Sequence, residues 1–176
     1  RFQYNNSLRD LFGIRTDVFE LSEKMMTRHN NYLSSADHKI PDLVRASAKN
    51  RTKGFREVRP FPKDLRAAHG FDNQSDQLTL SPLLLDSFLK LSVSILQSPD
   101  FNENTVGIWK EFFANPENPW DLEKEIRDRL HPFLRMAFRS SVEEEVEDRY
   151  VRYAYEQIKS DGSYISGMKK VVSAIL

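Results

Sequence analysis

The sequence predicts an all-α fold, an irregular multi-helix bundle, with two packed helical subdomains as an open alternative. Three observations favour helices. Apolar residues recur with a helical period in most segments, no stretch alternates as a half-buried strand does, and Ser, Thr, Pro and Gly stand where helices begin and end. With 39% hydrophobic residues and 12 Phe in 176 residues, the chain can bury a core.

The first helix is expected over residues 2–12, with apolar residues at helical spacing and Gly13 as its stop. We interpret its polar residues as a solvated face. The alternative is that Asn5 and Asn6 pin a neighbouring loop. The polar residues are Asn5, Asn6, Ser7, Arg9 and Asp10.

A second helix is expected from Thr16, and a further one after Pro41. Residues 50–62 have no period and contain Gly54, Pro60 and Pro62, so we expect a loop. Residues 39–66 carry nine Lys or Arg and three acids, a balance of +6, whereas residues 100–148 carry thirteen acids and six bases, a balance of −7. We expect the two regions to face each other; a basic patch for an acidic partner is the alternative.

The stretch 70–82 is predicted to be a structured loop that directs the helix after it. Gly70 suits a sharp turn, and Asp72, Asn73 and their polar neighbours can bond their own backbone. Ser81 can cap the following helix and Pro82 fits its first turn. The functional alternative is a calcium site formed by Asp72, Asn73 and Asp76, although calcium takes about six to eight oxygen ligands and these side chains supply too few.

The helix after this loop, residues 83–97, carries two adjoining apolar stripes. Such a pattern predicts a central, largely buried helix around which the other helices pack. Thr105 is expected to start a short apolar segment ending near Phe113. The prolines at Pro116 and Pro119 then indicate a boundary.

Three helices are expected in the remaining chain. The first, residues 120–138, contains Pro132, which predicts a kink or a restart near His131. Ser141-x-x-Glu144 resembles a capping box for the second, Gly162 ends it, and Ser163 starts the last. We therefore predict a helical domain at 1–99, a linker with a short helix at 100–119 and a helical domain at 120–176. The last helix has no cap, so we expect this domain to be truncated.

Composition excludes several kinds of chemistry. The absence of Cys rules out disulfides, thiolate metal sites and c-type haem attachment within this chain. No phosphate-binding loop or zinc-protease motif is present, and the four His are scattered. Zero net charge gives no bulk attraction to nucleic acid, and no apolar run is long enough for membrane insertion. We assign no catalytic and no cofactor-binding residue.

Three motifs carry a resemblance to known proteins. The first is R-F-x-Y-N-N-S-x-R-D-L-F-G at residues 1–13, which includes Arg9 and Asp10. The second is G-F-D-N at 70–73 (Gly70, Phe71, Asp72 and Asn73), followed by L-T-L-S-P at 78–82. The third is F-L-R-M-A-F-R at 133–139, followed by Val142-x-x-Glu145. In this order they resemble two adjacent helical domains of unknown function in planctomycete-type multidomain proteins.

The resemblance covers most of the chain. It is weakest over 24–58, which we interpret as a basic insertion, and Met136 stands where the family pattern has Arg. It implies a periplasmic or extracellular parent protein, often with a cytochrome c-like domain, so that haem c would lie elsewhere in the parent. It carries no catalytic residue over to this chain.

Two hypotheses about function follow. The first is a non-catalytic helical module of a larger extracytoplasmic, cytochrome-associated protein, which scaffolds or docks neighbouring domains or chains. The alternative is part of an enzyme, acting on polysaccharide or in redox chemistry, whose active site is completed by domains outside this chain.

Overall fold

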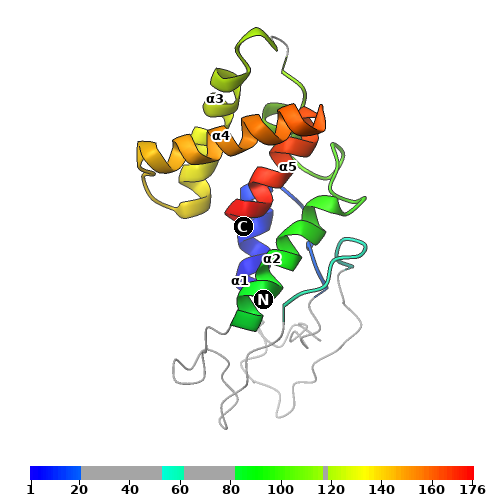
Figure 1. Cartoon of the computed structure of the whole chain (residues 1–176). Coiled ribbons are helices and arrows are strands. Elements are labelled where there is room, and N and C mark those ends of the chain that lie inside the picture. The colour runs from blue at the N-terminus through cyan, green and yellow to red at the C-terminus, as the bar shows by residue number, and fades with distance from the viewer. Residues whose placement is uncertain (21–52, 62–81, 117–118) are drawn as a thin grey trace, which may run out of the picture.

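The computed structural model describes residues 1–20, 53–61, 82–116 and 119–176. Every regular element in these ranges is a helix, which confirms the all-α prediction for them (Figure 1). The elements are α1 (Phe2–Phe12), α2 (Pro82–Gln97), a π-helical turn (Trp109–Phe113), a 3₁₀ turn (Pro119–Asp121), α3 (Leu122–Phe138), α4 (Glu144–Asp161) and α5 (Tyr164–Ile175).

Helix α5 connects the two ends of the molecule. It packs against α4 on one side and α2 on the other, and Figure 1 shows it running from α4 toward α1 and α2. Its buried residues include Met168, Val171 and Val172. At the crossing with α2, the Ser92 hydroxyl donates to the carbonyl oxygen of Ser173 at 2.9 Å. The most central helix is therefore the last one.

Helix α2 is only half buried, so the prediction of a largely buried central helix is wrong. Leu91, Ile95 and Leu96 are at most 2% exposed, but Leu83, Leu85 and Leu89 are 70%, 53% and 59% exposed. Two adjoining apolar stripes need two partner surfaces. Among the described residues, Phe88 of one stripe packs against Tyr4 and Phe61, whereas Leu85 and Leu89 of the other are exposed.

The core is rich in phenylalanine. The ring of Phe12 lies 5.2 Å from that of Phe101 and 5.9 Å from that of Phe133, centroid to centroid. Phe101 in turn lies 5.4 Å from Phe113, edge to face, the geometry that aromatic pairs prefer. The domain division at residues 99 and 119 stays a prediction.

Helix boundaries agree with several sequence signals and differ at others. Gly13 and Gly162 adopt left-handed φ angles of 64° and 65° after α1 and α4, and Ser163 accepts from Ser166 N–H at 3.3 Å. Helix α3 continues through Pro132 without a restart, since Leu130, Phe133 and Leu134 anchor that turn in the core.

The predicted capping box at the start of α4 is absent. The N-cap is Glu143 rather than Ser141, and its side chain makes no cap hydrogen bond. Thr105 does not start a helix either, because its hydroxyl donates to the Asp100 carbonyl and closes a turn over residues 100–105.

One polar residue of α1 is fully buried, which corrects the expectation of a solvated face. Asn5 is 0% exposed; its amide nitrogen donates to Asp17 Oδ1 at 2.6 Å and its oxygen accepts from Val18 N–H at 2.8 Å. These bonds hold residues 14–20 as an irregular segment against α1, so no helix starts at Thr16 within that segment. The loop-pinning alternative is thus correct for Asn5.

The basic and acidic regions meet at one described point. Arg56 donates to both carboxylate oxygens of Asp100, with Nη2 2.8 Å from Oδ1, and the Arg56 backbone N–H donates to Oδ2 at 2.7 Å. These hydrogen bonds hold the pKa of the Asp100 carboxyl below its usual value. The pair fastens the loop at 53–61 to the turn that follows α2.

Candidate functional site

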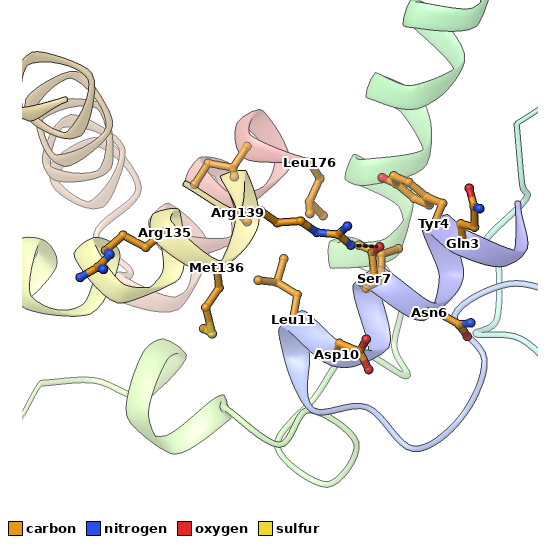
Figure 2. A pocket seen from close by; sticks show the side chains of 13 residues that line it. Gln3, Tyr4, Asn6, Ser7, Asp10, Leu11, Arg135, Met136, Arg139 and Leu176 are labelled. Carbon is orange, nitrogen blue, oxygen red and sulfur yellow. Dashed lines mark hydrogen bonds between the residues drawn. The ribbon is translucent and has the colours of Figure 1, made fainter. Parts of the chain in front are cut away.

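An open groove of about 1140 Å³ lies between α1, the end of α3 and the end of α5 (Figure 2). Seven of its thirteen lining residues are apolar, and these come from all three helices. One lip belongs to α1 and the other to α3. The lining residues are Gln3, Tyr4, Asn6, Ser7, Leu8, Asp10, Leu11, Arg135, Met136, Ala137, Arg139, Ile175 and Leu176.

The amphipathic pattern of α1 explains its lip. Leu8 and Phe12 are buried in the core. Ser7, Asp10 and Leu11, spaced three and four residues apart, lie on the side of α1 that lines the groove. On the opposite lip, Met136 is 54% exposed although Phe133 and Leu134 beside it are buried. An unbranched, polarizable thioether adapts to varied contacts, which suits a binding surface.

Arg139 ends α3 in an unusual backbone conformation. Its φ is 53°, the left-handed region in which α1 and α4 use Gly13 and Gly162. A residue other than glycine in this left-handed backbone conformation costs about 1 kcal/mol relative to glycine. The Arg139 guanidinium reaches across the groove, and its Nη2 donates to Ser7 Oγ at 2.9 Å (Figure 2). The strained position therefore places a positive charge between the two lips.

A second hollow of about 510 Å³ extends the groove along α3. It shares Arg135, Met136 and Arg139 with the first and adds Pro132, Ser140 and Ser141. In Figure 2 the Arg135 side chain lies on the side of α3 away from α1. The two hollows together form a track that passes from α1 over the end of α3.

Within the part of the chain that the structure describes, the arginines at this track lack the carboxylate partners that the earlier arginines of α3 have. Arg127 Nη1 lies 2.6 Å from Asp148 Oδ1, and Arg129 Nη2 lies 2.6 Å from Glu125 Oε1. Among the described residues, no carboxylate lies within ion-pair distance of Arg135 or Arg139. The track thus carries two guanidiniums without a carboxylate partner there, with Asp10 on the α1 lip.

Tyr4 closes one end of the groove. Its ring lies 5.5 Å from Phe88 of α2 and 5.7 Å from Phe61. The buried hydroxyl has no hydrogen-bond partner in the described part of the chain. Burial raises the pKa of Tyr4 to about 12, because the phenolate would lose its hydration.

The site residues named from the sequence are only partly within the described ranges. Gly70, Phe71, Asp72, Asn73, Asp76 and Ser81 lie outside them, so the calcium site stays a prediction. Pro82 is the first residue of α2, as predicted. Arg9 pairs with Asp17 at 3.5 Å, and Asp10 lines the groove. The described residues contain no cluster of three or more metal-binding side chains.

Sequence reasoning missed the groove itself. In the sequence, Arg135, Met136 and Arg139 stand out only as parts of the F-L-R-M-A-F-R motif. One signal was available, because α3 ends at Arg139-Ser140-Ser141 without the glycine that follows α1 and α4. A non-glycine residue at such a stop marks a side chain for closer inspection.

The fold and the groove together define an all-α protein with an open surface groove. A model of an uncharacterised family, described as "Protein of unknown function (DUF1587)", matches residues 40–98. This is about a third of the chain, and it includes the G-F-D-N motif at 70–73 and helix α2. No curated protein and no solved structure matches the chain. Within the described ranges, no helix is long and apolar enough to cross a bilayer.

Proposed function

We propose that this chain is a helical docking module that holds a neighbouring domain or chain in the groove between α1 and α3. The groove is the observation that carries the proposal. Its volume of about 1140 Å³ exceeds the roughly 300–1,000 Å³ of most small-molecule sites. An apolar floor between polar lips is the usual arrangement of a protein interface.

The exposed half of α2 supports the same function. Leu85 and Leu89 lie one turn apart on the same face of the helix, and both are more than half exposed, as is Leu83 on another face. Clustered exposed apolar side chains mark interaction surfaces more often than isolated ones do. The chain therefore offers a second surface on which neighbouring domains could rest.

The resemblance to planctomycete-type multidomain proteins supports a finer version of the proposal. The docked partner is then a domain of the same extracytoplasmic parent protein or an associated cytochrome c-like chain. In this version the module positions redox or binding domains and performs no reaction itself.

Site-specific crosslinking in the cells that produce the protein tests the proposal. A photoreactive phenylalanine analogue replaces Met136 at the groove, and in a matched control it replaces Glu156, an exposed residue of α4. Because Met136 is half exposed on the lip, the analogue can enter the interface without disturbing the core. We expect an adduct from position 136 and none from position 156.

Mass spectrometry of the adduct decides the outcome. A crosslinked peptide from another region of the same polypeptide, or from a haem c-bearing chain, supports docking. Equal crosslinking from both positions, or none from position 136, contradicts it.

A further inference from the structure

We infer that the groove binds an amphipathic peptide segment with apolar residues on one face and acidic residues along the edge that faces α3. This inference rests on the proposed docking function and names the chemistry of the docked partner. It is carried by three features of the track: its size, its charge and the backbone at Arg139.

Size and lining favour a polypeptide segment. The groove and the hollow at the end of α3 are neighbours, because Arg135, Met136 and Arg139 line both. Leu11, Leu176 and Met136 offer apolar contacts along it. An amphipathic helix binds such a groove by placing its apolar residues, spaced three and four apart, on the floor.

The charge of the α3 lip selects acidic residues. Arg135 and Arg139 stand four positions apart at the end of α3, Arg139 turned toward α1 and Arg135 on the side away from it (Figure 2). Neither has a carboxylate partner among the described residues. Guanidiniums bind carboxylates in a bidentate geometry, which adds specificity to the charge attraction. Within the described ranges the hydrogen bond of the Arg139 side chain goes to the neutral hydroxyl of Ser7, a weaker acceptor that a carboxylate can replace.

The opposite lip sets the orientation. Asp10 is exposed on α1 and repels acidic residues there. The acidic edge of the segment therefore faces α3, and the edge toward α1 is neutral or basic. A simple polyanion such as a sulfated polysaccharide meets the two arginines but gains nothing from the apolar floor.

The backbone at Arg139 indicates that its side chain has a use. Glycine would fit φ 53° without strain, as Gly13 and Gly162 do at the ends of α1 and α4. A strained residue that persists at the lip of a groove points to a function of its side chain. Here that side chain is the one that spans the two lips (Figure 2).

Two synthetic peptides test the inference. The first is a helical peptide with leucines on one face and glutamates along one edge, and the second has lysines in place of the glutamates. Fluorescence anisotropy measures the binding of each to the whole 176-residue chain. We expect the glutamate peptide to bind and the lysine peptide to bind at least about tenfold more weakly, since like charges then meet at the lip.

Variants locate the site. The double substitution Arg135→Glu with Arg139→Glu should weaken glutamate-peptide binding by about tenfold or more. Arg139→Gly should also weaken it while the protein stays folded. Arg152→Glu, an exposed change on α4 outside the groove, should leave it unchanged.

The outcomes separate this inference from the proposed function. Equal binding of the two peptides, or glutamate-peptide binding retained by the double variant, overturns the acidic-peptide inference. Competition by heparin with an affinity equal to that of the glutamate peptide also overturns it, because the apolar contacts would then contribute nothing. If crosslinking from position 136 still yields a defined partner, docking stands and only the chemistry of the partner is wrong. If position 136 gives no defined adduct and the glutamate peptide does not bind preferentially, both proposals are overturned.

Discussion

The side-chain amide of Asn5 and the carboxylate of Asp17 lie 2.6 Å apart in the interior of the protein, where Asn5 has no solvent exposure. The same Asn5 side chain accepts from the backbone N–H of Val18. One polar residue of α1 therefore determines the path of the chain that follows it.

Replacing Asn5 with alanine should destabilise the protein by about 2–3 kcal/mol, because a buried N–H and a buried carboxylate each lose a partner. Asn6→Ala is the matched control, because the Asn6 side chain is partly exposed on the groove side. We expect it to change the free energy of unfolding by no more than about 0.5 kcal/mol. Urea unfolding followed by circular dichroism measures both. Equal losses in the two variants would show that Asn5 has no special role.

Gly167→Ala should destabilise the crossing of α4 and α5. A β-carbon at Gly167 would lie 2.4 Å from Ile158 Cγ1 and 2.8 Å from the Ile158 backbone nitrogen. Overpacking of this kind costs typically about 1–3 kcal/mol. Adding Ile158→Ala removes the clash with the Ile158 side chain but leaves the clash with its backbone. Thermal melts of the double variant should therefore show that only part of the steric cost of Gly167→Ala is recovered. Unchanged stability in Gly167→Ala would mean that the helices are farther apart.

Alkaline pH should unfold the protein partly through Tyr4. Burial raises its pKa to about 12, above the value near 10 of a tyrosine in the unfolded chain. The folded state therefore holds this proton more tightly, so the contribution to stability is full below about pH 10 and is lost between about pH 10 and 12.

The Tyr4→Phe variant should lose less stability over this alkaline range than the wild type does. Its stability at neutral pH should be equal or higher, since the hydroxyl has no described partner. Melting temperatures recorded across the range measure the effect, with Tyr153→Phe, an exposed site on α4, as the control. If the stability of Tyr4→Phe and of the wild type falls equally with rising pH, Tyr4 does not cause the alkaline loss of stability.

Arg139→Gly should leave the protein at least as stable as the wild type. Relief of the left-handed backbone gains about 1 kcal/mol, and loss of the exposed hydrogen bond to Ser7 costs about 0.5–1 kcal/mol. Ser7→Ala removes only the hydrogen bond and so should be slightly destabilising. A loss of several kcal/mol in Arg139→Gly, measured by urea unfolding, would show that the guanidinium holds the fold together.

The two faces of α2 should respond differently to a polar side chain. Leu85→Gln changes a residue that is 53% exposed and should alter stability by less than about 0.5 kcal/mol. Leu91→Gln buries an amide at a site that is 2% exposed and should cost more than about 3 kcal/mol. Chemical denaturation compares the pair. Equal costs would mean that the first half of α2 is covered after all.

Helix positions could be predicted from the sequence because their signals are local. Apolar spacing located α1, α2 and the last three helices, and Gly13 and Gly162 marked two ends, since their left-handed turns follow from residue type. The capping box predicted at Ser141 is wrong because a local pattern does not determine where the helix starts in the folded chain. Its pattern fits a helix start, but the chain continues extended to Glu143 before α4 begins.

Burial and the groove could not be predicted because they depend on contacts distant in sequence. The apolar stripes of α2 specify faces but not which face α5 will cover. Asn5 looks like an ordinary polar surface residue until residues 14–20 fold over it. The groove needs α1 together with α3 and α5, whose lining residues come more than a hundred positions after those of α1, as the Ser7–Arg139 bond illustrates.

The hydrogen bond between Ser7 and Arg139 joins residues 132 positions apart, and the Phe12 carbonyl likewise accepts from Ile108 N–H. Helix α1 has only 11 residues, and isolated helices shorter than about 12–15 residues are marginal in water. Within this chain α1 is translated well before α3, so its contacts with Phe133 and Arg139 can form only after α3 has also been made. The packing of α1 is therefore completed late, and chaperones can reach its unpacked side until then.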